Sequence, residues 1–351
     1  MNAPVHVVAT GARTPVGLTA ESAAAAVRAR ISRIAEHPFL VDLRGEPVRM
    51  ARDGLLAPGL FGVPRMIALV RSAFDEVIGK CGPPASTMRM VLLVGLPEFR
   101  PGWTERDMGA VEQELMLSFR VMSGKPHVIP GGHAAALEAL RRGVELIGEG
   151  RADLCLVGGV ESYLEPDTLL WLDRNRQLLR SGMRSAFHPG EGAGFLAIAG
   201  ERVRQRLDLR SLGIILATQV SRETSLIKTD DLSTGEGLTR AIQAVTAKWR
   251  ERGERVDDVY CDLNGERYRT EEWGFALLRT QGAFGDVSAV RTAVSEWGDM
   301  GAASGALLSI LALRAWARGY ARGPTALVWG SSEGGLRGAA LLRRTESGGQ
   351  P

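Results

Sequence analysis

Two kinds of apolar pattern alternate along this chain. Short runs rich in β-branched and aliphatic residues predict buried strands, as in residues 5–10 and 90–96, while apolar residues at helical spacing predict an amphipathic helix over residues 65–80. Further strands are expected at residues 153–157, 192–199, 214–220, 256–262, 325–330 and 337–344, and further helices at residues 21–31, 105–118, 133–149, 235–251 and 301–317. Strands that alternate with helices predict parallel βαβ units, and therefore an α/β protein.

The stretch from residue 127 to residue 162 is the most informative part of the chain. A Pro130-Gly131-Gly132 turn precedes a helix whose first two turns carry almost no polar face, so this end of the helix should be buried. Gly150 should end the helix, and the following strand should end at a pair of glycines. A buried helix N-terminus behind a glycine turn can hold a nucleophile or an oxyanion. The residue at that point is His133.

The order of elements indicates two halves. We expect an N-terminal half over residues 1–205, a C-terminal half over residues 206–345 that repeats its rhythm, and a polar tail over residues 346–351. Residues 33–64 are predicted to be irregular, with a hairpin-like piece near residues 48–53, and residues 164–184 to form a connector of mixed polarity.

Three motifs resemble those of the β-ketoacyl synthases of the thiolase superfamily. The opening sequence VVATGARTPVGL matches the start of that family, Gly-Arg-Ala-Asp at residues 150–153 leads to Gly-Gly-Val-Glu at residues 158–161, and Gly-Glu-Gly-Ala-Gly occupies residues 190–194. The resemblance implies a duplicated, five-layered αβαβα thiolase-like fold. In that fold, the two Ala- and Gly-rich helices, one per half, pack against each other between two sheets.

The resemblance also indicates where the family carries its reacting groups, and this chain differs at each position. His133 takes the place of the catalytic cysteine, Asn264 that of the first catalytic histidine, and Arg337 that of the second. Asp299 replaces the histidine of a K-S-x-x-G-H motif, and Glu333 replaces a glycine of the last glycine turn. These five residues are the candidate site. The glycines of the scaffold match, whereas the groups that perform condensation do not.

Two functions follow from these substitutions. In the first, the chain is a pseudoenzyme that acts as a non-condensing partner or scaffold subunit, and His133 fills the old pocket and bonds to Asn264 or Glu333; chain-length-factor subunits are a precedent. In the second, His133 serves as the nucleophile of an acyltransferase or thioester hydrolase, with Asp299 or Glu333 as the visible candidate bases. Arg337 could hold a phosphate or carboxylate of an acyl-carrier ligand, or pair with Glu333. A tunnel that reaches His133 would favour the enzyme, and a filled one the scaffold.

Composition narrows the range of partners. The chain has 351 residues, 45% of them hydrophobic, with 43 basic and 40 acidic residues mixed along it and no basic run with interleaved aromatics, so we expect no nucleic-acid binding. The absence of a G-x-G-x-x-G pattern and of His/Cys clusters gives no sign of a cofactor or metal. Three cysteines without C-x-x-C spacing favour a cytoplasmic protein, and no run is long enough to cross a membrane. The resemblance implies a homodimer, or a heterodimer with a synthase-like protein, and acyl-carrier protein or acyl-CoA as possible ligands.

Overall fold

In the described part of the chain, ten strands form one sheet, and the five strands at one end pair in the same way as the five at the other. The computed structural model describes residues 4–82, 88–119, 123–226, 229, 233–288 and 290–345, so the expected tail at residues 346–351 lies outside the described residues. The strand order is β10-β9-β11-β12-β8-β1-β7-β6-β4-β5. The strands are β1 (Val5–Arg13), β4 (Met90–Leu96), β5 (His127–Pro130), β6 (Leu154–Ser162), β7 (Glu191–Gly200), β8 (Gly213–Arg222), β9 (Asp258–Cys261), β10 (Val290–Arg291), β11 (Thr325–Ser331) and β12 (Leu336–Arg343).

The pairing within each set of five strands is the same. In the first set, β1 runs antiparallel to β7 and β7 antiparallel to β6, whereas β6, β4 and β5 are parallel. In the second set, β8 runs antiparallel to β12 and β12 antiparallel to β11, whereas β11, β9 and β10 are parallel. The expectation of parallel units is therefore correct for only part of the sheet. The short turn between β11 and β12 leaves no room for a crossover connection, so these two strands must be antiparallel.

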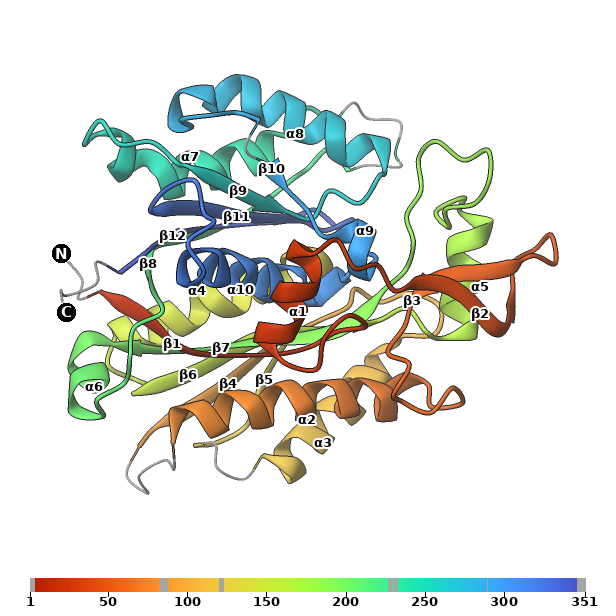
Figure 1. Ribbon diagram of the computed structural model, residues 1–351, viewed down its shortest axis with the longest axis horizontal. Coiled ribbons are helices and arrows are strands. Elements are labelled where there is room, and N and C mark those ends of the chain that lie inside the picture. The colour runs from red at the N-terminus through yellow and green to blue at the C-terminus, as the bar shows by residue number, and fades with distance from the viewer. Residues whose placement is uncertain are drawn as a thin grey trace.

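Helices form three layers around the strands, which gives the five-layered arrangement (Figure 1). The central layer holds α4 (Ala135–Gly148) and α10 (Ser304–Ala317). One outer layer holds α2 (Gly62–Cys81) and α3 (Glu105–Ser118), and the other holds α7 (Glu236–Arg250) and α8 (Arg267–Thr280). The expected α/β, duplicated thiolase-like fold is thus confirmed.

The central helices can lie this deep because small residues line their contacts. Nearly every residue of α10 is buried, whereas α4 is buried only in its first two turns and around Gly143, and reaches solvent at its charged end. A Cβ added to Gly305 would lie 2.7 Å from Cγ of Leu137, and one added to Gly159 would lie 2.1 Å from the carbonyl oxygen of Ala302. Glycine at these positions lets the two helices and strand β6 approach one another closely.

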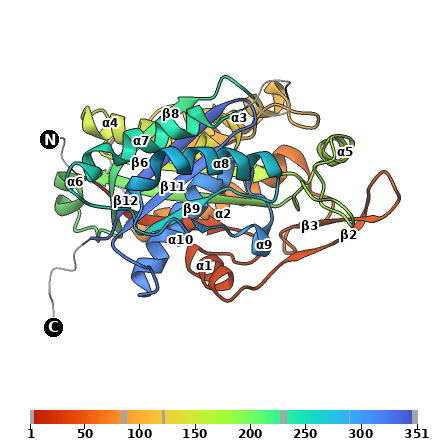
Figure 2. The same cartoon turned by 90° about the horizontal axis from the view of Figure 1, so that it is seen from above.

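The remaining elements connect these layers. Helix α1 (Ala20–Arg28) is capped by Thr19, and β2 (Ile34–Val41) pairs with β3 (Pro47–Ala51) in a hairpin that projects from the body (Figures 1 and 2). The other short elements are α5 (Pro166–Arg174), α6 (Glu201–Arg206), α9 (Val294–Trp297) and the 3-10 turns η1 (Gly132–Ala134), η2 (Gln281–Ala283) and η3 (Gly301–Ala303). The division expected at residues 205 and 206 falls in the last turn of α6 and stays a prediction.

Three local expectations were wrong. The region expected to be irregular contains the β2–β3 hairpin. The hairpin-like piece expected near residues 48–53 covers only β3, and β2 gave no pattern because most of its side chains are exposed and need no apolar alternation. The helix expected from residue 133 begins at Ala135, after the single 3-10 turn η1. The strand expected to stop at Gly158 and Gly159 runs on to Ser162, because both glycines lie inside β6, where neighbouring groups leave no room for a side chain.

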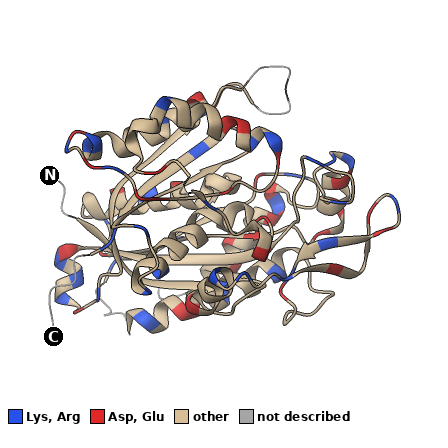
Figure 3. Ribbon diagram, turned by 45° about the horizontal axis from the view of Figure 1, so that its top comes forward, with Lys and Arg blue, Asp and Glu red and all other residues tan. Residues whose placement is uncertain are grey.

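Positive and negative side chains are interspersed over the elements rather than gathered by sign (Figure 3). In the described part of the chain, no helix is both long and apolar enough to cross a membrane.

Candidate functional site

His133 lies in a buried, tight turn between strand β5 and helix α4. Gly132 precedes it with a φ of 60°, a backbone conformation that favours glycine, and this turn directs the chain from β5 into η1 and α4. The second half makes a similar turn: Gly301, with a φ of 41°, opens η3 directly ahead of α10. The two 3-10 turns contact each other, so His133 and Asp299 come together from residues far apart in the sequence.

The side chains of His133 and Asp299 form a buried pair. Nε2 of His133 lies 2.9 Å from Oδ1 and 3.0 Å from Oδ2 of Asp299. Asn264 donates to the same carboxylate at 2.6 Å, the Tyr163 hydroxyl at 3.1 Å and the Gly301 N–H at 2.7 Å. Burial alone would raise the pKa of Asp299, but the charge and hydrogen bond of His133, together with Arg269 and Asn264, hold that pKa far below its ordinary value. Asp299 is therefore an ionised, fully engaged carboxylate.

Arg269 contacts the other side of the imidazole. Its Nη2 lies 3.3 Å from both ring nitrogens of His133, and the same guanidinium pairs with Asp262 and Glu266, each at 3.1 Å. Burial and the charge of Arg269 both lower the pKa of His133, but the Asp299 carboxylate outweighs them and the net pKa is raised. In the charged form, His133 has no free lone pair. In the neutral form, Nε2–H donates to Asp299 and the Nδ1 lone pair faces the Arg269 donor.

A cavity of about 490 Å³ reaches His133 from the surface. Arg100 stabilises one wall, because it donates to Glu161 at 2.6 Å and its guanidinium lies 4.4 Å from the centre of the Tyr163 ring. Glu333 lies on the wall and accepts a hydrogen bond from Gln177 at 2.8 Å. The lining also includes Glu98, Phe99, Pro130, Gly132, Trp171, Leu172, Phe187 and Gly334.

The structure unites four of the five expected site residues. His133, Asn264 and Asp299 are joined by hydrogen bonds, and Glu333 shares the cavity with His133. Arg337 does not belong to this group. Its guanidinium is fully buried, pairs with Glu272 at 2.5 Å and donates to the carbonyl oxygen of Ser332 at 2.6 Å.

Two expected pairings are therefore wrong. The partners of His133 are Asp299 and Arg269 rather than Asn264 or Glu333, because η3 packs directly on η1 whereas Glu333 lies in the β11–β12 turn. Arg337 pairs with Glu272 of α8 and not with Glu333, and its buried position leaves it no access to a ligand phosphate or carboxylate.

Sequence reasoning missed Arg269, Tyr163, Glu161 and Arg100. Arg269 lies near the start of α8, a helix that the pattern did not predict because its apolar residues lack a clear helical repeat. Glu161 belongs to the Gly-Gly-Val-Glu motif, so its place at the end of a buried strand was a usable signal. The other two gave no signal, since only the fold brings them to the cavity.

Comparisons with known proteins agree with this fold. The model of the "beta-ketoacyl synthase, N-terminal domain" family matches residues 119–201. Among solved structures, the chain is similar to a type II polyketide synthase ketosynthase in complex with its acyl-carrier protein (14% identity, TM-score 0.82, covering 99% of this chain and 100% of that one). It is also similar to the ishigamide ketosynthase/chain length factor (15% identity, TM-score 0.77, covering 99% of this chain and 100% of that one). A third similar structure is the ketosynthase from module 6 of the bacillaene synthase of Bacillus subtilis 168 (14% identity, TM-score 0.77, covering 98% of this chain and 72% of that one).

No curated protein matches the chain. Identities of 14–15% carry the fold, and the family model adds a match in sequence over the segment that contains His133. The chain is therefore a β-ketoacyl-synthase-like protein with a thiolase-type fold.

Proposed function

We propose that this chain is a non-condensing partner subunit of a ketosynthase-type assembly. The observation that carries the proposal is the internal ion network at the centre of the site. His133 and Asp299 use each other, Asn264 and Arg269 as partners, and the whole group is buried. Breaking a buried charged pair is costly, so a substrate would have to replace these contacts before it could react there.

The thiols of the chain support the same reading. Condensation of the family type needs a thiolate to hold the acyl chain. Cys155 and Cys261 are buried within strands, where burial raises the pKa of Cys155 to about 12 and that of Cys261 further. Cys81 lies at the end of α2, with a pKa raised by burial to about 11. Of the described residues that line the His133 cavity, none is a cysteine.

A second candidate function, a His133-dependent acyltransferase or thioester hydrolase, is favoured by one observation. The cavity of about 490 Å³ does reach His133, and its volume falls in the range of small-molecule sites. Attack by His133 would require a free lone pair on one ring nitrogen, and the contacts to Asp299 and Arg269 leave none. The role as a partner subunit is therefore the favoured function, and in that role the cavity shapes or holds an acyl group.

The assembly we propose is a dimer, either of this chain alone or with a synthase-like protein. Strand β5 (His127–Pro130) is the outer strand of its sheet and pairs only with β4 among the described residues, so its other edge can join a partner strand. Helix α3 beside it exposes Met116 and Leu117, each about half exposed (50% and 51%). A ketosynthase/chain length factor and a ketosynthase in complex with an acyl-carrier protein are among the similar structures, which makes a synthase or a carrier protein the natural partner to test.

The chemical test is intact-mass spectrometry after incubation with short and long acyl-CoA and acyl-carrier thioesters, with release of the free thiol followed in parallel. Wild type and His133→Ala are compared. The proposal predicts neither an adduct nor thiol release above background in either protein. An adduct, or thiol release that depends on His133, would overturn it and establish the enzymatic alternative.

The assembly test is native mass spectrometry of the protein alone and after co-expression with a cysteine-containing ketosynthase. A homodimer or a one-to-one heterodimer is expected. A Val128→Pro substitution in β5 should weaken either dimer, because proline removes an edge hydrogen-bond donor. A monomer under both conditions would refute the role as a partner subunit.

A further inference from the structure

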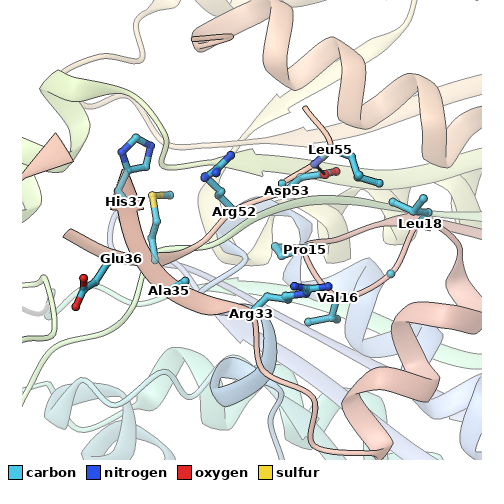
Figure 4. Close-up of a pocket in the computed structure, with 13 residues that line it drawn as sticks. Pro15, Val16, Leu18, Arg33, Ala35, Glu36, His37, Arg52, Asp53 and Leu55 are labelled. Atoms are coloured by element: carbon cyan, nitrogen blue, oxygen red, sulfur yellow. Dashed lines mark hydrogen bonds between the residues drawn. The ribbon is translucent and has the colours of Figure 1, made fainter. Parts of the chain in front are cut away.

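A second pocket lies apart from the His133 site, between the loop that follows β1 and the β2–β3 hairpin (Figure 4). Its volume is about 440 Å³, enough for a small molecule. The lining comes from three segments, residues 15–18, 33–37 and 50–55. Nothing in the proposed function uses this pocket.

Two buried donors in the pocket wall have no acceptor among the described residues. His37 is only 3% exposed, and its Nδ1 accepts hydrogen bonds from the backbone N–H groups of Phe39 (3.4 Å) and Leu40 (3.1 Å). Because Nδ1 is the acceptor, Nε2 carries the proton and is a donor. This Nε2 and the Nη1 of Arg52 are both buried, and neither has a hydrogen-bond partner in the described part of the chain. Buried donors are nearly always paired, so the two together indicate an absent acceptor.

The charge around these donors also favours an anion. Arg33 and Arg52 both line the pocket, and Figure 4 shows Pro15 between them. Burial, together with the charges of Arg52 and Arg65, lowers the pKa of His37 and keeps its ring neutral. The imidazole therefore adds a donor without adding a charge that would itself need a counterion.

The two acidic residues of the lining do not neutralise the guanidinium of Arg52. Asp53 is already paired with Arg13, whose Nε lies 2.5 Å from its carboxylate. The side chain of Glu36 is directed away from Arg52 in Figure 4, and the residue is exposed. A carboxylate or phosphate entering the pocket would thus meet an arginine that has no competing acidic partner among the described residues.

The rest of the wall is apolar. Pro15, Val16 and Leu18 come from the loop after β1, and Leu55 from the loop after β3. Leu18 and Leu55 are 42% and 71% exposed, so an apolar portion of a ligand that covered them would remove apolar surface from water.

We propose that this pocket binds a small amphiphilic anion. Its phosphate or carboxylate group accepts hydrogen bonds from Arg52 and from Nε2 of His37, and its apolar portion covers Leu18 and Leu55. The inference is independent of the chemistry at His133, because the two pockets share no lining residue.

Isothermal titration calorimetry of the full chain tests the proposal with four probes. Hexyl phosphate and hexanoate carry both features, while hexanol lacks the anion and inorganic phosphate lacks the apolar portion. At least one amphiphilic anion should bind, at least about tenfold more tightly than hexanol, since a charge-assisted hydrogen bond is lost with the neutral probe. The stronger of the two anions identifies the headgroup as phosphate or carboxylate. Equal binding of hexanol, or no binding of any probe, would overturn the proposal.

Two variants on the same hairpin provide the matched comparison. Arg52→Gln should weaken binding of the preferred anion at least about tenfold, whereas Arg49→Gln should leave it unchanged. Arg49 is an exposed residue of β3 and does not line the pocket. Equal losses in both variants would refute a specific site. Because Nη1 of Arg52 has no hydrogen-bond partner among the residues that the structure describes, the folded state should tolerate its removal.

A spectroscopic readout on the wild type needs no variant. The His37 Nε2–H proton should shift and exchange more slowly with solvent when the anion binds, because it gains an acceptor. If the protein were saturated with the preferred anion and this resonance did not change, His37 would be excluded from the site and the proposed binding geometry would be refuted.

Discussion

The buried pair at the centre of the site gives the sharpest prediction. In Asp299→Asn the negative charge disappears, while His133 and Arg269 stay buried beside the new amide. Oδ1 of Asp299 accepts from His133, Tyr163 and the Gly301 N–H, and Oδ2 accepts from His133 and Asn264. An amide has only one acceptor oxygen, so its NH₂ group must face at least one of these donors.

The expected loss of stability is large. Removing one partner of a buried ion pair typically costs about 3–5 kcal/mol, because the other charges remain in a low-dielectric interior. With an unfolding entropy of about 2.1 cal/mol/K per residue, that cost lowers the Tm of a chain of this length by about 4–7 °C. Differential scanning calorimetry measures the shift directly.

A matched surface variant isolates the effect of burial. Asp286→Asn makes the same chemical change in an ion pair with Arg322, whose two side chains are about half exposed (52% and 46%). Its Tm should stay close to that of the wild type, since solvent screens such pairs. If Asp299→Asn lowered the Tm by no more than Asp286→Asn does, the argument that this network stabilises the centre of the molecule would fail.

The same variant tests the electrostatic argument. Burial and Arg269 both lower the pKa of His133, and Asp299 is the main group that raises it. Without that carboxylate, the pKa of His133 should fall below its ordinary value of about 6.5. A titration of the His133 Cε1–H resonance by NMR follows this change. An unchanged pKa in Asp299→Asn would mean that another group sets the charge state of the imidazole.

Three further predictions concern pH, packing and thiol reactivity. The fold raises the pKa of His133, so the stabilisation of the fold by its protonated imidazole should be complete below about pH 6.5 and lost as the pH rises through the folded-state pKa. The Tm measured against pH should show this decline, and His133→Gln should abolish the decline. Gly159→Ala should cost about 1–3 kcal/mol in chemical denaturation because its Cβ would lie 2.1 Å from the Ala302 carbonyl, whereas Gly109→Ala in α3, with open space around it, should be neutral or stabilising. The pKa of the Cys81 thiol is raised to about 11 and those of the other two thiols further, so a thiol reagent at pH 7 should label the native protein much more slowly than the unfolded chain; rapid labelling would contradict the burial.

Most of the architecture could be predicted from the sequence because a strand or helix that is buried on all sides consists of a nearly continuous run of apolar residues. The apolar runs of β4 and β11 and the nearly unbroken apolar surface of α10 are visible in the residues themselves. Strand β2 was missed for the converse reason: most of its side chains are exposed and need no apolar periodicity. Helix α8 was not predicted either, so Arg269, which contacts His133 from one side, was missed with it.

The sequence by itself determined which residue types are available at the candidate site. It placed His133 behind a glycine turn, and it offered Asp299, Asn264, Glu333 and Arg337 as its companions. The tertiary structure alone decided how they pair. Asp299 lies 166 positions after His133 along the chain, and only the packing of η3 on η1 brings the carboxylate within 2.9 Å of the imidazole. Side-chain pairing across such a separation depends on distance and burial in the folded molecule, which no local pattern encodes.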